Sequence, residues 1–315
     1  MVADTVRNTS FRTAIERAVA RRPGCRVLDI GAGTGLLGLI ASRAGASRVD
    51  CVEMSDVLHV TARRTLEASG VNPSSSAVWH TISTELPIDP SGVNGPPGQA
   101  DLIVSEILDS GLIGEGVLHT MRDAASRLLA PGGQLLPRGA TVYAMAVELR
   151  PPEVGDFDLR ALEQLRRGCF YSSMRLHTLG HVKLSSAVAA FEFDFASPGP
   201  LEPDGVTPSD REVRLSLPIT KRGTCNAILW WFDLHLDDEL TLPAGPGASV
   251  RTWKQNVAHV EPGIKVKKGD VIEALVWTQR DDQIHVAGGK PGVKRPTTLG
   301  SSNRLEPSFM LRDVS

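Results

Sequence analysis

The sequence predicts an α/β chain in two parts, a doubly wound domain built on a parallel sheet and then an antiparallel β-barrel domain. Up to residue 136, strand-like and helix-like runs alternate, which is typical of parallel strands joined by crossover helices. From residue 137 onward the runs are short and often alternating, and Gly, Pro and Asp separate them, which is typical of an antiparallel sandwich or barrel. We therefore expect domains over residues 1–136 and 137–315.

The first part is expected to alternate helices and strands in a regular order. Apolar residues at helical spacing, among them Phe11, Ile15 and Val19, predict the first helix, and Gly45 and Gly70 end the next two. Helices are expected at 9–20, 36–45, 55–70 and 117–133, the last ending at a Pro-Gly-Gly sequence. A strand runs from residue 25 into a glycine-rich turn, and further strands are expected at 48–54, 77–83 and 100–106.

The second part is expected to consist mainly of strands. The strand-like runs cover residues 141–149, 188–195, 212–219, 226–236, 263–279 and 282–288. One insert, residues 151–173, has helical spacing instead.

Composition narrows the class of protein. With 315 residues and 41% hydrophobic residues the chain can bury a sizeable core, and the net charge of -2 gives no reason to expect binding to nucleic acid or to an anionic membrane. The N-terminus is charged and no long apolar run occurs, so we expect a soluble, non-secreted protein. The four cysteines are scattered, which fits a reducing cytoplasm or nucleus, and no metal site is predicted because His177 and His181 lack a zincin-like glutamate.

The glycine-rich turn VLDIGAGTG allows two interpretations. Gly33, Gly35 and Gly38 satisfy the dinucleotide pattern G-x-G-x-x-G, and Glu53, at the end of the second strand, suits a pair of ribose hydroxyls in either case. Asp29 separates the two, because a carboxylate at the mouth of the site would repel a pyrophosphate but not a sulfonium cofactor with an α-amino group.

Asp29, Gly31, Gly33 and Gly35 together resemble motif I of the doubly wound S-adenosylmethionine-dependent methyltransferases. The resemblance implies that the glycines let the backbone approach the cofactor and that Glu53 holds its ribose. An ordinary tight turn of an α/β protein is the alternative.

Two glutamates follow the strand at 100–106. Glu106 lies at its carboxyl end, where doubly wound folds bind ligands, and Glu115 follows nine residues later. The chain lacks the Asn/Asp-Pro-Pro-aromatic motif of methyltransferases that act on nucleobases, whereas paired carboxylates suit a guanidinium, a planar cation that forms bidentate hydrogen bonds. For each residue alone, a helix cap or a solvated charge is the better interpretation.

Glu106 and Glu115, placed after this turn and strand, resemble the double-E loop of the protein arginine methyltransferases, and the loop spelling SEILDSGLIGEG is similar to the type III subfamily, which stops at monomethylarginine. The resemblance implies that both glutamates are catalytic and bind the substrate, and that residues 151–173 form a dimerisation arm. The cofactor residues it implies are Arg7, Asp29, Gly31, Gly33, Glu53, Met54 and Ile82, and the further substrate contacts are Trp253 and Gln255.

The chain departs from the family pattern in two places. In the loop that usually reads Thr-His-Trp, Thr252 occupies the histidine position, so the charged pair of that histidine with an acidic residue, by position Asp4, should be absent. The Tyr-Phe-x-x-Tyr segment that precedes the first helix of the family is also missing before Met1. We expect either a different natural start or a shortened chain, with weaker cofactor binding in the absence of this lid.

The expected activity is methyl transfer from S-adenosyl-L-methionine to a guanidino nitrogen of peptidyl arginine, giving monomethylarginine and S-adenosyl-L-homocysteine without a metal. Dimethylating type I or II activity and a non-catalytic, cofactor-binding scaffold are the alternatives, and a nicotinamide oxidoreductase is a third. The resemblance implies arginine-containing protein substrates such as histones and RNA-binding proteins, a homodimer, no direct nucleic acid or membrane partner, and a cytoplasmic location that can extend to the nucleus.

Overall fold

The fold is described from a computed structural model that covers residues 2–150, 172–174, 180–197, 209–279 and 281–295. In the first part the elements are α1 (Thr5–Arg21), β1 (Arg26–Ile30), α2 (Leu36–Arg43), β2 (Arg48–Glu53), α3 (Asp56–Ala68), η1 (Pro73–Ser75), β3 (Ser76–His80), η2 (Ser83–Glu85), β4 (Ala100–Ser105), α4 (Val117–Asp123), η3 (Ala124–Leu128) and β5 (Leu129–Leu136). In the second part they are β6 (Gly139–Arg150), β7 (Ser172–Met174), β8 (Gly180–Lys183), β9 (Val188–Asp194), β10 (Glu212–Pro218), β11 (Gly223–His235), β12 (Thr241–Pro243), β13 (Gln255–Val266), β14 (Val271–Gln279) and β15 (Gln283–Gly289).

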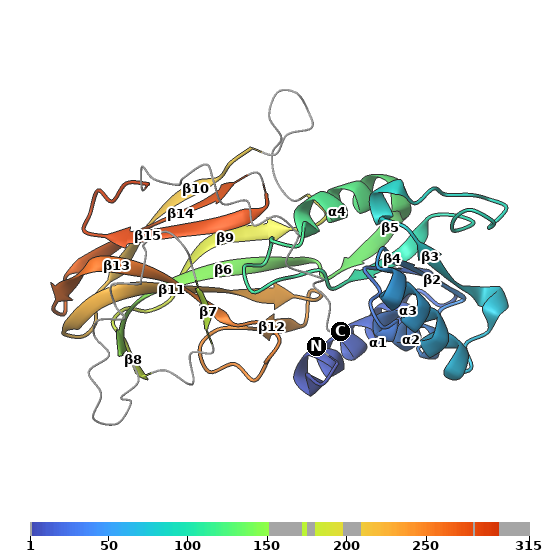
Figure 1. The fold of residues 1–315 in the computed structure, drawn as a ribbon, viewed down its shortest axis with the longest axis horizontal. Coiled ribbons are helices and arrows are strands. Elements are labelled where there is room, and N and C mark those ends of the chain that lie inside the picture. The colour runs from blue at the N-terminus through green and yellow to red at the C-terminus, as the bar shows by residue number, and fades with distance from the viewer. Residues whose placement is uncertain (1, 151–171, 175–179, 198–208, 280, 296–315) are drawn as a thin grey trace, which may run out of the picture.

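The first part is a five-stranded parallel sheet in the order β3-β2-β1-β4-β5. Figure 1 shows α1, α2 and α3 on one side of this sheet and α4 on the other. The order reverses between β1 and β4, and a doubly wound sheet binds its ligands at the carboxyl edge of such a switch point. The predicted fold class is therefore confirmed for this part of the chain.

Asp4 is the N-cap of helix α1, and its carboxylate accepts a hydrogen bond from the backbone N–H of Arg7. Phe11 and Ile15 are fully buried and lie on the stripe that the sequence predicts. The helix starts four residues earlier than its apolar pattern indicates, because the cap and the first turn are polar.

The predicted helix at 117–133 is wrong in its second half. Helix α4 ends at Asp123, a π-helical turn (η3) follows, and Leu129 already begins β5, the fifth strand of the sheet. β5 pairs in parallel with β4, with a bulge that accommodates the Pro-Gly-Gly sequence. The sequence shows a helix stop there, but the strand is stabilised by its pairing with β4, which no local pattern reveals.

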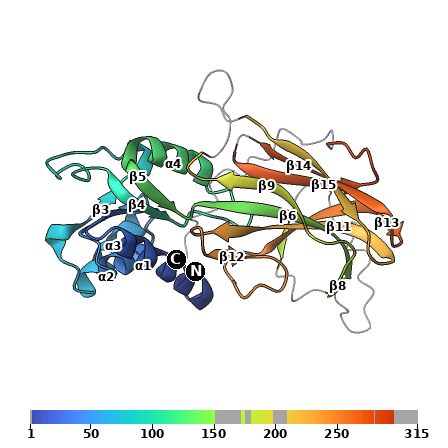
Figure 2. The same ribbon diagram turned by 180° about the vertical axis from the view of Figure 1, so that it is seen from behind.

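The second part is antiparallel, as predicted, and its strands curve around a common core (Figures 1 and 2). The described strands form two sheets: β10-β14-β15, and the path β7-β13-β11-β6-β8 with β12 added to β11 and β9 to β6. Predicted strand 263–279 is divided between the end of β13 and the whole of β14. Of the predicted arm at 151–173, residues 151–171 lie outside the described part of the chain.

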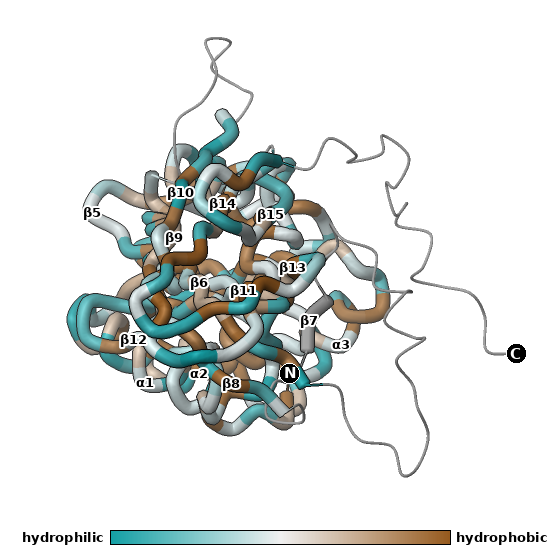
Figure 3. Tube along the Cα trace, turned by 90° about the vertical axis from the view of Figure 1, so that its left-hand side faces the viewer, coloured by the Kyte–Doolittle hydropathy of each residue, from teal (hydrophilic) through white to brown (hydrophobic). Residues whose placement is uncertain are grey.

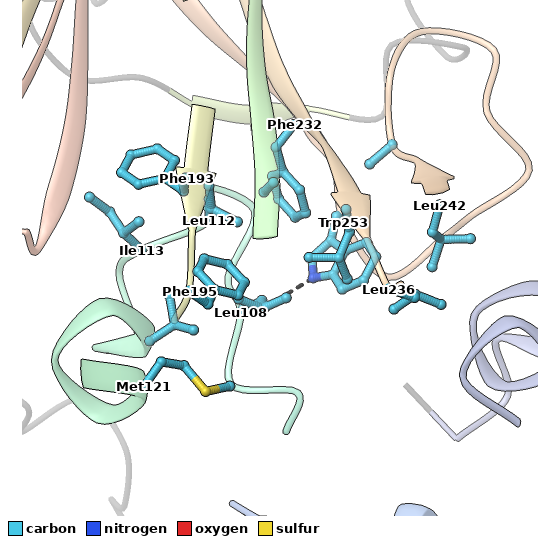
Figure 4. Close-up of a cluster of buried hydrophobic side chains, with 14 of the residues drawn as sticks. Leu108, Leu112, Ile113, Met121, Phe193, Phe195, Phe232, Leu236, Leu242 and Trp253 are labelled. Carbon is cyan, nitrogen blue, oxygen red and sulfur yellow. Dashed lines mark hydrogen bonds between the residues drawn. The ribbon is translucent and has the colours of Figure 1, made fainter. Parts of the chain in front are cut away.

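The hydrophobic core is continuous across the two parts. Viewed from the end of the antiparallel part, hydrophobic segments alternate with hydrophilic ones along the strands (Figure 3). Figure 4 shows where the parts meet, with Leu108 of the first part beside Trp253 of the second and with Ile113 on the side of Phe193. The loop that follows β4 is therefore fixed against the antiparallel sheet. No helix among the described residues has the length and apolar character needed to cross a membrane.

Candidate active site

The site lies where the order of the parallel strands reverses. β1 and β4 run side by side, with Ile30 opposite Ser105, and the Ser105 hydroxyl donates a 2.8 Å hydrogen bond to the Ile30 carbonyl oxygen. One strand continues into the glycine-rich turn and the other into Glu106. The two predicted halves of the site are thus neighbours at one edge of the sheet.

The glycine-rich turn has a backbone that only glycine accommodates easily. Gly31 has a φ of +69°, a conformation that a side chain disfavours. A Cβ atom there would lie 2.5 Å from the Cγ2 atom of Ile107, the residue that follows Glu106. The turn and the strand end therefore approach each other closely because residue 31 has no side chain.

Glu53 is buried at the end of β2, and backbone groups hold both of its carboxylate oxygens. Oε2 accepts a 2.8 Å hydrogen bond from Gly33 N–H, and Oε1 accepts one of 2.8 Å from Ser55 N–H. Each oxygen keeps further acceptor capacity for a hydroxyl pair. Met54 is 71% exposed and Ile82 is 40% exposed. Both follow parallel strands at the carboxyl edge of the sheet, where their side chains could pack against a flat ring of a bound ligand.

Asp29 differs from the prediction, because it lies beneath the turn and not at its mouth. Its side chain is buried and its Oδ2 atom accepts a 2.8 Å hydrogen bond from Gly38 N–H at the start of α2, while Oδ1 has no partner among the described residues. Burial raises the pKa of Asp29 to about 7. The strand alternation directs this side chain toward α2, so it acts on the turn from below.

Arg7 and Glu106 form a buried ion pair with 2.6 Å between Nη2 and Oε2. Arg7 Nε and Glu106 Oε1 have no hydrogen-bond partner among the described residues. Burial raises the pKa of Glu106 to about 7 although Arg7 opposes the rise, and the charge of Glu115 adds to it. Because these charges influence each other, Glu106 and Glu115 belong to the same electrostatic site.

The loop between the two glutamates is organised by Asp109. Its carboxylate accepts a 3.1 Å hydrogen bond from Gly114 N–H, and Leu112 has a positive φ of 72°. Glu115 is exposed, yet enough protein surrounds its carboxylate for burial to raise its pKa, and the charge of Asp109 raises it further. Asp109 is not among the site residues predicted from the sequence, although an aspartate ahead of a glycine-containing turn is a recognisable signal.

The loop before β13 closes the site from the antiparallel side. Trp253 is buried, and its indole N–H donates a 3.0 Å hydrogen bond to the Leu108 carbonyl oxygen (Figure 4). Gln255 is also buried, and its amide donates a 2.8 Å hydrogen bond to the Ala244 carbonyl oxygen. Both residues line a cavity of about 740 Å³ bounded by residues 3–6 and by the segment 245–255.

Thr252 makes a neutral contact where the family pattern has a charged one. Its hydroxyl and its backbone N–H each donate a 2.8 Å hydrogen bond to Asp4 Oδ2, and Arg251 N–H donates a third of the same length. The expected partner Asp4 is therefore found, joined to threonine by hydrogen bonds and not by a histidine ion pair.

The described residues fit a sulfonium nucleoside with an amino-acid tail. Arg7 Nε and Asp29 Oδ1 are buried polar atoms without a hydrogen-bond partner among the described residues, Glu53 presents a carboxylate, and Met54 adds an exposed apolar surface. Among the described residues, no group of three His, Cys, Asp or Glu side chains is arranged to hold a metal ion. A parallel sheet with this switch point and this turn fits the class of S-adenosylmethionine-dependent methyltransferases.

Comparison with known proteins identifies the branch of this class. Residues 138–287 match the family model of the arginine methyltransferase oligomerization subdomain, and residues 12–141 match that of ribosomal protein L11 methyltransferase. An arginine N(omega)-methyltransferase from Streptomyces achromogenes subsp. streptozoticus is 36% identical over 88% of this chain and 75% of its own length. The chain belongs to the arginine methyltransferase family.

Two further relatives are named as protein arginine N-methyltransferases, and one solved structure shares the fold. Protein arginine N-methyltransferase 7 of Oryza sativa subsp. indica is 34% identical over 75% of this chain, and protein arginine N-methyltransferase 9 of Homo sapiens is 29% identical over 89%. The chain spans only 34% and 36% of the lengths of these two relatives. The Trypanosoma brucei PRMT1 enzyme-prozyme heterotetrameric complex with AdoHcy has the same fold, with a TM-score of 0.70 at 20% identity over 88% of this chain and 85% of its own.

Proposed function

We propose that this chain transfers one methyl group from S-adenosyl-L-methionine to a guanidino nitrogen of arginine. The observation that carries the proposal is the buried Glu106 carboxylate, which lies beside the glycine-rich turn and within electrostatic reach of Glu115, and whose Oε1 has no hydrogen-bond partner in the part of the chain that the structure describes. Two carboxylates at this edge suit a planar cation with five N–H donors.

Glu106 is prepared for this task by Arg7. Because Arg7 occupies Oε2, the second oxygen is left to accept a hydrogen bond from the substrate guanidinium. Glu115 would accept from another nitrogen, so that the positive charge is drawn toward the bound nitrogens and a third nitrogen faces the donor. Positioning and electrostatic stabilisation then supply most of the rate enhancement.

The bound cofactor supplies an electrophilic methyl group on a sulfonium: the S–CH₃ bond breaks with its electron pair remaining on sulfur, the N–CH₃ bond forms, and S-adenosyl-L-homocysteine remains. The guanidino nitrogen loses one proton in the same reaction, and ionised Glu115, which is exposed, can pass it to water. Arg7 Nε, which has no partner among the described residues, is the atom we assign to the carboxylate of the cofactor.

Monomethylation is supported by the similarity of the loop SEILDSGLIGEG to the type III subfamily and by the identity with protein arginine N-methyltransferase 7. The names of the relatives differ on the form of the arginine. The Streptomyces relative is named for arginine, and the plant and human relatives are named for protein arginine. Peptidyl arginine in histones or RNA-binding proteins stays an expectation that the family resemblance implies.

A homodimer is part of the same proposal, since the family model matched by residues 138–287 is described as an oligomerization subdomain. Light scattering of the purified chain at micromolar concentration is expected to give the mass of two chains. A monomer mass throughout that range would remove this part of the proposal.

The test of the activity uses the variants Glu106→Gln and Glu115→Gln, with Glu85→Gln, an exposed glutamate on η2, as the matched control. Mass spectrometry of the products is expected to show a single methyl group on arginine, and each active-site variant is expected to lose about 100-fold or more in kcat. The control is expected to retain wild-type activity.

Three results would count against the proposal. Dimethylarginine as a product would replace monomethylation by type I or II activity. Wild-type rates in both glutamate variants would remove the guanidinium clamp. S-adenosyl-L-homocysteine binding without methylation of any arginine compound would favour the non-catalytic scaffold.

A further inference from the structure

The cavity beside Trp253 is lined by more positive than negative side chains, although the neighbouring glutamates are expected to bind a cation. Its lining includes three charged residues: Asp4, Arg251 and Lys254. Arg251 and Lys254 are exposed, and among the described residues neither side chain forms an ion pair or a hydrogen bond. Their positive charges are therefore available to a ligand.

Asp4 does not offset these two charges. Its Oδ1 accepts from Arg7 N–H at 3.1 Å, and its Oδ2 accepts from Arg251 N–H and from both donors of Thr252 at 2.8 Å. The carboxylate is thus used to join α1 to the loop before β13. An anionic group that enters the cavity meets two cations that have no ion-pair partner in the described part of the chain, and one carboxylate that already accepts four hydrogen bonds.

The cavity adjoins the guanidinium clamp. Trp253 lines the cavity and also donates its hydrogen bond to Leu108, two residues after Glu106. Lys254 N–H donates a 3.0 Å hydrogen bond to the hydroxyl of Ser110 in the same loop. The cavity is therefore joined, through Trp253 and Lys254, to the loop that carries the two glutamates.

We infer that this cavity binds an arginine with a free α-carboxylate, either the amino acid itself or an arginine at the C-terminus of a peptide. The carboxylate would pair with Lys254 and Arg251, which makes them specificity-determining residues. Arginine-rich internal segments would meet like charges at the same place, and like charges in close contact are unfavourable. The inference rests on the proposed function and names the form of its substrate.

The test compares four substrates with the full chain and S-adenosyl-L-methionine. L-Arginine is compared with agmatine, which has the guanidinium but no carboxylate, and a dipeptide ending in arginine is compared with its C-terminal amide. A charge-assisted carboxylate contact predicts a kcat/KM for each free carboxylate about 10- to 100-fold above that of its partner. Comparison of the first pair with the second distinguishes the amino acid from a peptide end.

The variants Lys254→Met and Arg251→Met, singly and together, are expected to reduce these two ratios toward one. Lys254→Arg keeps the charge and is expected to keep the preference. Lys265→Met, an exposed lysine on β13, is the matched control and is expected to leave both ratios as they are in the wild type. Melting temperatures of all variants verify that the exposed substitutions do not unfold the chain.

The failure of this inference is distinguishable from failure of the proposed function. Equal rates for L-arginine and agmatine, a preference for the amide, or ratios that survive in the double variant would overturn the carboxylate site, while methylation that depends on Glu106 would leave the methyltransferase activity intact. If none of the four compounds and no internal arginine peptide is methylated, the proposed function and this inference are both rejected.

Discussion

Replacement of Asp4 by alanine is expected to destabilise the chain more than any other single change at the junction of α1 and the loop before β13. The Asp4 carboxylate caps α1 through Arg7 N–H and accepts three further hydrogen bonds, one from Arg251 and two from Thr252. Alanine removes all four acceptor contacts at once, whereas Thr252→Val removes only the one made by the hydroxyl.

The magnitude follows from these contacts. Loss of a helix N-cap costs about 1 kcal/mol, and each backbone N–H left without its acceptor costs about 1–3 kcal/mol where water cannot replace it. Because Arg251 is exposed and Thr252 is half-buried, we take the lower end and expect about 3–4 kcal/mol for Asp4→Ala and about 1 kcal/mol for Thr252→Val. The cost of Asp4→Ala is a large fraction of a typical stability of about 5–15 kcal/mol.

Urea unfolding at pH 7 measures both values, and the pH dependence provides a second check. Burial by itself would raise the pKa of Asp4, but the hydrogen bonds from Arg251, Arg7 and Thr252 outweigh it and lower the pKa. A lowered pKa contributes stability above the unfolded value and loses it as the pH falls through the folded value. The difference between wild type and Asp4→Ala should therefore narrow below about pH 4. If Asp4→Ala costs no more than Thr252→Val, the assignment of Asp4 as the joint between the two parts is refuted.

Three further predictions concern the site itself. Because burial raises the pKa of Glu106 to about 7 and only the ionised form binds a guanidinium, kcat/KM should rise with pH up to about 7 and then level off; a profile flat from pH 5.5 to 8.5 would contradict this. Burial also raises the pKa of Asp29 to about 7, above its value in the unfolded chain. The free energy of unfolding therefore decreases as the pH rises through 7 and Asp29 becomes ionised in the folded protein. Asp29→Asn should then be more stable than wild type by roughly 2–4 kcal/mol at pH 8.5 in thermal melts of the ligand-free chain, with no difference at pH 4. Gly31→Ala should weaken binding of S-adenosyl-L-homocysteine in calorimetry, since its Cβ would lie 2.5 Å from Ile107 Cγ2; Gly31→Ala/Ile107→Ala should recover only the part due to this contact, because the positive φ remains.

The sequence by itself determined the class of the fold and the core of the site. Alternation of strands and helices fixes a parallel sheet, and a strand that ends in Glu106 must place that carboxylate at the ligand-binding edge. The glycine-rich turn is likewise a local feature, because a positive φ, and a backbone that neighbouring atoms approach closely, each require glycine at one position. Local patterns of this kind are readable without knowledge of the tertiary structure.

Only the tertiary structure decided which distant groups meet. Arg7 pairs with Glu106 across 99 positions of sequence, and Asp4 meets Thr252 across 248. β5 lies where the local pattern predicts the end of a helix, and it is a strand because its hydrogen bonds go to β4 and not to its own neighbours. Asp29, expected at the mouth of the site, is buried because the alternation of β1 directs it toward α2. In each case the stabilising partner lies on another element, so strand order and packing, and not local propensity, determine the contact.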